Sequence, residues 1–315
     1  MSDVILFGEP MTMFIADDYG PLEDVEHFTK SLAGAEVNVS IGLTRLGYKV
    51  NYITKLGSDP MGLYIKKFLE KESIGTEFIA FDPIYKTGFQ LKGKAKEGDP
   101  DVAYFRKGSA ASHLSVNEIN AIDLSGIKLI HITGIPPALS LSCREATYRL
   151  IQRAKENHIT LSFDPNLRPS LWENEATMIE VINDIARHCD YFLPGIEEGK
   201  ILCKKSKPEE IADFYHKSGI KTVIVKLGAD GSYLSNPSTK TFISGFKVDQ
   251  VIDTVGAGDG FATGIISGLL DNVPVEEAVI RGNAIGSIQV THISDNLGLP
   301  TRKQLFDYIR KGKTE

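Results

Sequence analysis

The 315-residue chain has only three cysteines, one tryptophan and no long apolar run. Cys143, Cys189 and Cys203 form no C-x-x-C pair and no metal-ligand spacing, which argues against structural zinc and favours buried, reduced thiols. No apolar stretch approaches the ~20 residues that a membrane-spanning helix needs. The first residues enter a strand-like segment directly, without the basic region and apolar stretch of a signal peptide. These absences predict a cytoplasmic protein.

An excess of positive charge is also absent, because the formal net charge is -6 and the pI is about 5.7. We therefore expect neither a nucleic acid nor a membrane as a partner, and an anionic substrate would need local Arg or Lys side chains. The hydrophobic and charged fractions, 42% and 24%, are ordinary for a globular protein with a sizeable core. The length suits one large α/β unit with a small appendage.

Short apolar segments alternate with amphipathic segments along most of the chain. The apolar segments are rich in Val, Ile and Phe without polar alternation, which is typical of parallel strands buried on both faces. The alternation predicts an α/β fold with a parallel sheet, right-handed crossovers and helices on both faces. The predicted strands are 4–7, 50–56, 129–133, 159–163, 191–193 and 222–227, and the predicted helices are 36–46, 62–72, 142–157, 173–188, 208–217, 260–270 and 275–292.

Two segments, 11–31 and 87–107, are poor in helix signals and interrupt this alternation. Within the second, strands 87–93 and 102–106 flank a connection that contains Gly98 and Pro100, which predicts a hairpin. We expect the two segments to form a small discontinuous sheet set against a main unit made of 1–10, 32–86 and 108–315.

The most informative motif runs from Asp253 to Gly264 and precedes an apolar, helix-like run. Gly256 and Gly258 allow a tight turn, and a glycine loop that opens a helix is an anion site, because its N–H groups and the helix dipole favour negative charge. Asp259 suits a base that removes a proton from a hydroxyl while neighbouring N–H groups hold phosphoryl charge. From these residues alone, a turn with an aspartate helix cap is an equally good interpretation.

Other known nucleotide-binding motifs do not match this sequence. Walker A requires a glycine where Asp307 stands, and the dinucleotide fingerprint requires a glycine where Phe261 stands. The catalytic-loop and metal-binding motifs of protein kinases are missing. A nicotinamide-dependent oxidoreductase is therefore disfavoured.

Three ordered motifs resemble the PfkB (ribokinase-like) family of carbohydrate and nucleoside kinases. They are D-T-x-G-A-G-D at 253–259, A-G-A-E-V-N-V at 33–39 followed by Leu43, Leu46 and Gly47, and K-L-G-S-D-P-M-G at 55–62. Ala33 departs slightly, since the family often has Gly there. The resemblance implies a three-layer α/β sandwich with a mostly parallel central sheet and a small β-sheet lid, for which 11–31 and 87–107 are the candidates.

The resemblance also implies site roles. Gly256, Ala257 and Gly258 would form the anion hole, Asp259 would be the base, and Glu198 would serve Mg²⁺, although Gly195 replaces the Asn that the family has three residues earlier. The segment 226–231 also fits a plain strand and turn, and Asn283 fits an ordinary helix position. ATP and Mg²⁺ are the implied cofactors, with a monovalent cation such as K⁺ left open. The implied nucleotide-binding residues are Asn166, Lys226, Gly228, Gly231, Gly258 and Asn283.

Two segments indicate the acceptor. Y-F-R-K-G-S-A-A-S at 104–112 and D-P-N-L-R-P-S-L-W at 164–172 resemble the 2-keto-3-deoxygluconate kinases of the family, as does Gly8-Glu9-Pro10. Arg106 in the first segment and Arg168 in the second suit bidentate recognition of a carboxylate, although each of them alone also fits a surface ion pair. Phe89 stands where that group often has Tyr, and Asp295 also fits a loop cap. The implied acceptor contacts are Gly34, Asn38, Phe89, Tyr104, Arg106, Arg168 and Asp295.

The predicted reaction is transfer of the ATP γ-phosphoryl group to the 6-hydroxyl of 2-keto-3-deoxygluconate. Two alternatives stay open at this point: a fructokinase, which shares the second acceptor segment, and a non-catalytic regulatory member of the family. Acceptance of the C4 epimer is also open. We expect a homo-oligomer, because exposed lid sheets often pair through their edges.

Overall fold

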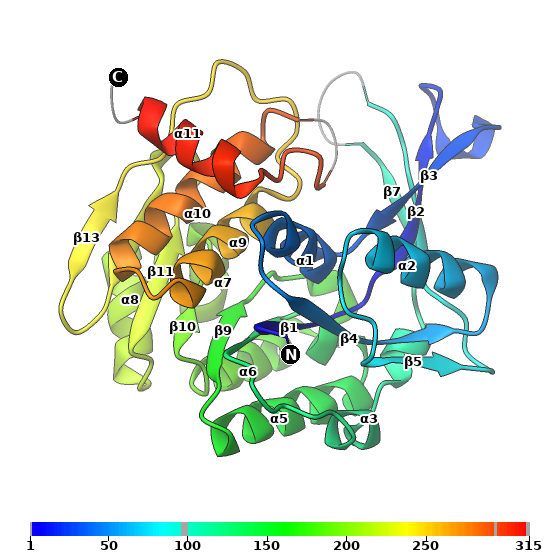
Figure 1. Cartoon of the computed structure of the whole chain (residues 1–315), viewed down its shortest axis with the longest axis horizontal. Coiled ribbons are helices and arrows are strands. Elements are labelled where there is room, and N and C mark those ends of the chain that lie inside the picture. The colour runs from blue at the N-terminus through cyan, green and yellow to red at the C-terminus, as the bar shows by residue number, and fades with distance from the viewer. Residues whose placement is uncertain (1, 96–99, 293–294, 313–315) are drawn as a thin grey trace.

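In the computed structural model, which describes residues 2–95, 100–292 and 295–312, a large sheet forms the centre of the molecule (Figure 1). All six strands predicted for the main unit are found in it, because these Val-, Ile- and Phe-rich runs are buried on both faces. The nine strands within the described residues are β1 (Val4–Phe7), β4 (Val50–Gly57), β5 (Ile79–Asp82), β8 (Leu129–Thr133), β9 (Thr160–Asp164), β10 (Tyr191–Phe192), β11 (Thr222–Lys226), β12 (Ser232–Ser235) and β13 (Lys240–Ile243).

The strand order across this sheet is β13-β12-β11-β10-β9-β8-β1-β4-β5. All neighbours from β11 to β5 are parallel, whereas β11, β12 and β13 are joined by antiparallel pairing. The carboxyl ends of the parallel strands therefore meet at one edge of the sheet. In β1, Val4 and Leu6 point to one face and Ile5 and Phe7 to the other, so each face is covered by its own apolar cluster.

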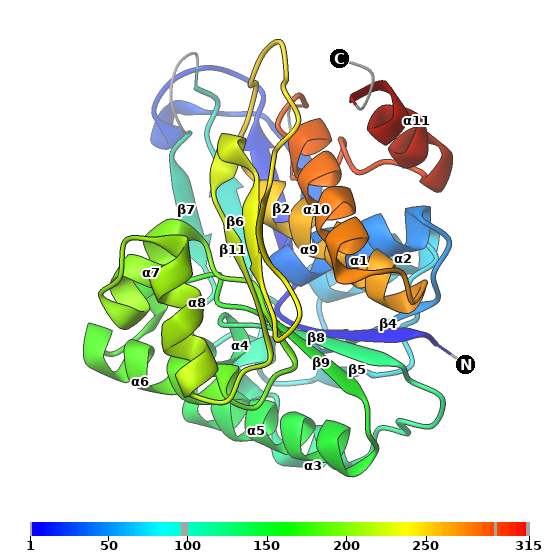
Figure 2. The same ribbon diagram turned by 90° about the vertical axis from the view of Figure 1, so that its left-hand side faces the viewer.

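Helices cover both faces, as Figures 1 and 2 show from two directions. This arrangement confirms the prediction of three layers with a mostly parallel central sheet. One layer contains α1 (Ala35–Arg45), α2 (Pro60–Lys71), α9 (Ala257–Leu270), α10 (Val275–Gln289) and α11 (Arg302–Gly312). The other contains α3 (Val116–Asn120), α5 (Leu141–Glu156), α6 (Glu175–Ala186), α7 (Ile196–Cys203) and α8 (Pro208–Lys217), and a short helix, α4 (Pro136–Leu139), follows β8. Among the described residues, no helix is long and apolar enough to cross a membrane.

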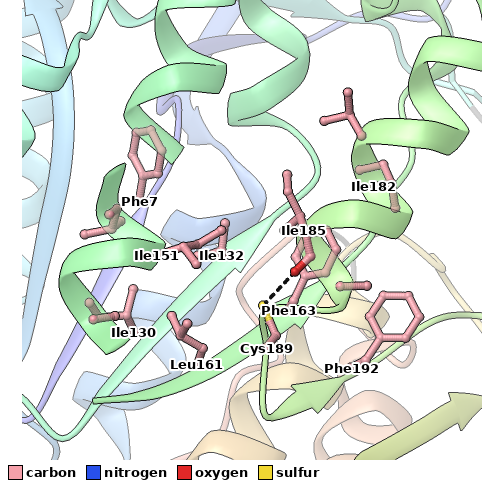
Figure 3. Close-up of a cluster of buried hydrophobic side chains, with 14 of the residues drawn as sticks. Phe7, Ile130, Ile132, Ile151, Leu161, Phe163, Ile182, Ile185, Cys189 and Phe192 are labelled. Atoms are coloured by element: carbon pink, nitrogen blue, oxygen red, sulfur yellow. Dashed lines mark hydrogen bonds between the residues drawn. The ribbon is translucent and has the colours of Figure 1, made fainter. Parts of the chain in front are cut away.

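Figure 3 shows part of the core beneath the second helix layer. Phe163 of β9 and Phe192 of β10 stack there with ring centroids 5.7 Å apart. The Cys189 thiol donates to the Ile185 carbonyl at the end of α6. All three cysteines are buried and free, as predicted, and burial raises the pKa of Cys143 to about 11, so its thiol stays protonated and unreactive near neutral pH.

A second, smaller sheet has the order β3-β2-β6-β7 and lies beside the main sheet (Figure 1). Its strands are β2 (Met11–Ala16), β3 (Phe28–Ala33), β6 (Phe89–Lys92) and β7 (Val102–Phe105). The antiparallel pairing of β6 with β7 confirms the predicted hairpin, while Gly98 in its connection lies outside the described residues. The parallel pairing of β2 with β6 joins the two helix-poor segments into one sheet.

Helices α9 and α10 pack at very short range because both carry glycines at their contact. A Cβ atom added to Gly264 would lie 2.3 Å from the backbone nitrogen of Gly282, a distance that only backbone movement could relieve. We therefore expect Gly264→Ala to lower the free energy of unfolding by about 1–3 kcal/mol, the usual cost of overpacking.

Chemical denaturation measures this effect through the transition midpoint. Gly286→Ala in α10 is the matched control, since the nearest atom to its added Cβ would be the Ala257 carbonyl oxygen at 3.3 Å. Equal midpoints for Gly264→Ala and the control would contradict the close approach of α9 and α10.

Candidate active site

A cavity of about 470 Å³ lies between the small sheet and the carboxyl ends of the main-sheet strands. Asp164 at the end of β9 and Lys226 at the end of β11 line one side, and Gln90 of β6 and Tyr104 of β7 line the other. Open α/β sheets bind ligands at this edge. Most residues predicted for the site line this cavity: Gly34, Asn38, Tyr104, Arg106, Asn166, Arg168, Glu198, Lys226, Gly256, Gly258, Asp259 and Asp295.

A second cavity of about 330 Å³ adjoins the first. Its lining includes apolar side chains such as Phe246 and Val251, together with four residues predicted for the nucleotide or the anion hole: Gly228, Gly231, Ala257 and Asn283. Lys226, Thr254 and Gly258 line both cavities. A ligand with a flat apolar group in the second cavity could therefore extend its polar end toward Asp259 in the first.

Asp259 lies in the first turn of α9, where its carboxylate reaches the first cavity. The Asn38 side-chain amide, from α1, donates to its Oδ2 atom at 2.8 Å. Burial raises the pKa of Asp259 to about 7; the negative charges of Asp164 and Asp295 add to this effect, and Asn38 and Arg168 oppose it. The carboxyl group is thus poised to gain or lose a proton near neutral pH.

Gly256 is the N-cap of α9 and needs to be glycine for two reasons. Its φ of +81° lies in the left-handed region, and a Cβ there would be 2.3 Å from the Asp295 carbonyl oxygen. The Ala257 amide donates a long hydrogen bond, 3.3 Å, to the Thr254 carbonyl. Helices leave their first N–H groups without helical acceptors, so the start of α9 provides both cavities with a site for negative charge.

Lys226 is held where the two cavities meet. Its Nζ atom lies 2.8 and 2.7 Å from the two carboxylate oxygens of Asp164 and 3.9 Å from Glu198. Burial alone would lower the pKa of Lys226, but the Asp164 and Glu198 carboxylates raise it above its usual value. A Cβ on Gly258 would be 3.8 Å from the same Nζ, so a permanent ammonium charge adjoins the start of α9.

Arg106, which follows β7, is buried and already paired. Its Nε and Nη2 atoms lie 2.6 and 2.5 Å from Oε2 of Glu9, a carboxylate that follows β1 and is 2% exposed. Ser109 donates to the other oxygen of Glu9. The guanidinium group is therefore fixed in orientation and contributes one edge of the cavity.

Arg168 differs from the other cations of this cavity. Its guanidinium donates to the backbone carbonyl of Leu167 at 2.9 Å, and it makes no ion pair with a carboxylate of the described residues. It is exposed, whereas the others are largely buried. The other three are each paired: Lys92 with Asp295, Arg106 with Glu9, and Lys226 with Asp164.

This geometry can be set beside known proteins. The sequence pattern of the pfkB family carbohydrate kinases matches residues 1–302. The chain belongs to the pfkB family of carbohydrate kinases. The predicted family and enzyme class, a phosphotransferase acting on carbohydrates, are thereby confirmed.

Relatives and solved structures agree with this assignment. The kinase is 46% identical to a 2-dehydro-3-deoxygluconokinase of Bacillus subtilis (strain 168), over 99% of this chain and 97% of the relative. It superposes on a PfkB protein from Polaromonas sp. JS666 with a TM-score of 0.89 and 45% identity, covering 97% and 99% of the two chains. A Vibrio cholerae O395 fructokinase variant, with fructose, ADP and potassium ion bound, gives a TM-score of 0.85 at 26% identity and 98% coverage of each chain.

One predicted acceptor contact of the kinase needs correction. Phe89 does not line the cavity; its ring stacks on Phe105 at a centroid distance of 4.6 Å and meets Phe14 edge-on, on the opposite face of the small sheet. Side chains alternate along a strand, so the next residue, Gln90, faces the cavity instead. The prediction identified the right strand but the wrong face.

Asn283, which was predicted to contact the nucleotide, lies in the wall of the second cavity, and its side chain is engaged within the kinase. The amide nitrogen donates to the carbonyls of Ile243 and Ser244 at 3.0 and 3.1 Å, and the amide oxygen accepts from Ser232 at 3.1 Å. These bonds join α10 to β12 and β13. Asn283 therefore shapes the cavity wall, and its polar atoms are largely occupied.

Glu198 is the residue that the sequence assigns to Mg²⁺. Its two oxygens accept from the backbone amides of Leu167 and Gly195 at 2.9 and 2.6 Å, which caps α7. No group of three or more His, Cys, Asp or Glu side chains arranged to hold a metal occurs within the described ranges. The remaining lone pairs of Glu198 fit hydrogen bonds to metal-bound water better than direct coordination.

Three charged residues of the cavity were not predicted as site residues: Glu9, Lys92 and Asp164. Glu9 and Asp164 belong to motifs that the sequence displays; Glu9 lies two residues after the end of β1, and Asp164 is the last residue of β9. That position at the carboxyl edge of the sheet was the available signal. Lys92 had no such signal, because it shares the face of Gln90 and the sequence alone does not show which face of β6 meets the cavity.

Proposed function

We propose that this kinase transfers the γ-phosphoryl group of ATP to the 6-hydroxyl of 2-keto-3-deoxygluconate. The observation that carries the proposal is an arginine free of carboxylate partners, Arg168, in the same cavity as Asp259. A neutral sugar would leave this guanidinium without a matching anion, whereas a sugar acid supplies one. The Bacillus subtilis relative, which is matched over 99% of this chain and 97% of its own length, supports this acceptor.

In the proposed reaction, Asp259 removes the proton of the acceptor hydroxyl as phosphoryl transfer begins. Asn38 donates to Oδ2 and so leaves Oδ1 to face the hydroxyl. The first turn of α9, at Gly256, Ala257 and Gly258, stabilises the charge on the transferred group. Gly34, Tyr104, Arg106 and Asp295 complete the acceptor chamber.

We assign the second cavity to the nucleoside part of ATP, with Gly228, Gly231 and Asn283 in its wall. Lys226 and Asn166 would lie beside the phosphates, and the Lys226 ammonium would neutralise charge between donor and acceptor. Mg²⁺, when bound, would offset phosphate charge, with Glu198 and Asp164 ordering its water ligands. We leave open whether K⁺ binds, although a fructokinase neighbour contains it.

We further propose that segments 11–31 and 87–107 act as a lid on the unit formed by 1–10, 32–86 and 108–315. The cavity face of β6 and β7 supports this, since Gln90, Lys92 and Tyr104 all point toward the carboxyl edge of the main sheet. Such closure would exclude water from the transferring phosphoryl group.

The deciding experiment is a parallel phosphorylation assay with 2-keto-3-deoxygluconate, fructose and ribose at equal concentrations. We expect the sugar acid to have the highest kcat/KM. A preference for fructose would replace the proposal by a fructokinase, and ATP turnover with none of the three would reject all these acceptors. A protein that neither binds nor hydrolyses ATP would be a non-catalytic member of the family.

The raised pKa of Asp259 predicts a pH dependence. A base acts when deprotonated, so kcat/KM should rise with pH and level off above about 7. One unit below that pKa, about one molecule in ten has the active carboxylate, and the rate should be roughly tenfold lower. A pH series at saturating Mg²⁺ and ATP, with the acceptor far below its KM, measures this.

Ionisation of the substrates could imitate this profile, so a variant provides the control. The negative charge of Asp295 helps to raise the pKa of Asp259, and Asp295→Asn should therefore move the midpoint to lower pH. A substrate ionisation would not respond to this change. An unchanged midpoint in Asp295→Asn would contradict the assignment of the profile to Asp259.

A further inference from the structure

Lys92 is a buried cation that connects the small sheet to two loops of the main unit. It is the last residue of β6 and is 9% exposed. Its Nζ atom lies 3.1 Å from Oδ1 of Asp295 and 3.7 Å from Oδ2 of Asp253. Asp253 precedes α9 and Asp295 follows α10, so one ammonium group links three distant parts of the chain.

Both partners of Lys92 lie directly against the glycine loop. The Asp253 Oδ1 atom accepts from the Val255 amide at 2.9 Å, which shapes the turn leading into Gly256. The Asp295 carbonyl occupies the space where a Gly256 side chain would be. A shift of either aspartate would therefore displace the start of α9.

The contacts continue from Asp295 to the proposed base. Its neighbour Asn296 donates to Oδ1 of Asn38 at 3.3 Å, and Asn38 donates to Oδ2 of Asp259 at 2.8 Å. The small sheet thus reaches the base through Lys92, the 295–296 loop and Asn38. Without the lysine, two largely buried carboxylates would face each other with no countercharge, which is strongly unfavourable.

We propose that Lys92 is a positioning residue that couples the closed state of the small sheet to the catalytic arrangement of the Gly256 loop. This inference rests on the proposed function, because it concerns the same site. It predicts that closing the sheet over the acceptor and ordering the anion hole are one event. Opening at β6 releases Asp253 and Asp295 together, and the loop loses its support.

The experiment compares Lys92→Met, which removes the charge at similar length, with Lys92→Arg, which keeps it. Hydrogen exchange of the protein without substrate should be about tenfold faster in Lys92→Met, both in β6 and in the 253–257 loop. Lys92→Arg should restore most of the protection. Lys94→Met is the matched control. The Lys94 ammonium donates to the backbone carbonyl of Asp17, and both residues belong to the helix-poor segments 11–31 and 87–107.

Kinetics provide the second readout. Lys92→Met should raise the KM for the acceptor and also lower kcat about tenfold, because both closure and the loop are affected. A loss of folded protein alone would lower the active fraction and leave kcat per active site unchanged. Lys94→Met should match the wild type in both constants.

A reciprocal variant keeps the proposal testable if Lys92→Met does not fold. Asp253→Asn can still accept from Val255 but loses its charge, and it should speed exchange in β6, far away in sequence. Unchanged β6 exchange in Asp253→Asn, or wild-type exchange in Lys92→Met, would overturn the coupling. Exchange needs no acceptor, so this result stands apart from any failure of the sugar acid as substrate.

Discussion

Asp259→Asn should lower kcat by ~10²–10⁴, the usual cost of losing a general base. The asparagine keeps the size of the side chain and can still accept the hydrogen bond from Asn38, so the cavity should keep its shape. ATP binding should change little, because the start of α9 remains intact. Steady-state turnover and titration with a non-hydrolysable nucleotide measure the two effects separately.

Asp249→Asn is the matched control, since Asp249 is an exposed carboxylate in the loop before the glycine motif. It should retain wild-type turnover. If Asp259→Asn also retained near-normal turnover, Asp259 would be a helix cap and nothing more. That outcome would restore the alternative that the motif alone could not exclude.

Arg168→Ala should lower kcat/KM for 2-keto-3-deoxygluconate about 10- to 100-fold and change the value for fructose little. Truncating one partner of a desolvated charge pair costs ~2–5 kcal/mol. Arg168 is exposed before substrate binds, and exposed pairs are worth less, so we expect a cost at or just below the lower end of that range. Initial rates with both acceptors measure the difference.

Arg168 gives a cleaner test than Arg106. Removing Arg106 would leave the Glu9 carboxylate buried and unpaired, so its loss would mix substrate binding with stability. Arg187→Ala, an exposed arginine after α6, is the control and should leave both acceptors unaffected. Equal losses for the acid and for fructose in Arg168→Ala would mean that the arginine serves ATP or the fold.

The parallel strands of the main sheet could be predicted from sequence, because strands that are buried on both faces have continuous runs of Val, Ile and Phe. Helix α11 was not predicted, since only Leu305 and Ile309 of its residues are buried and most of the others are polar or charged. The antiparallel β12 and β13 were also missed. Strand β13 has alternating exposed positions and no buried run, so its pairing depends on β12 rather than on its own pattern.

The same distinction applies to the residues of the site, where local features could be predicted from the sequence and long-range pairings could not. The glycine motif predicted a loop that opens a helix at Asp259, and Asp259 lies in the first turn of α9, because such a loop is a local feature. Which face of β6 meets the cavity could not be predicted from the local sequence. Phe89 and Gln90 are adjacent, and the pairing of β6 with β7 decides which of the two side chains meets the cavity. The contact of Lys92 with Asp295 joins residues 203 positions apart, and no short-range pattern carries it.

The alternation of side chains on the small sheet has a consequence for the evolution of the enzyme. Gln90 and Tyr104 line the first cavity from the short strands β6 and β7, while Asp259 and the glycine loop belong to the start of α9 in another part of the chain. We expect replacement of Gln90 or Tyr104 to retune the cavity without touching Asp259 or the glycine loop, whereas Lys92, which contacts Asp253 and Asp295 beside that loop, is tied to both. Preference for a sugar and the chemistry performed on it can therefore be inherited and modified as separate traits.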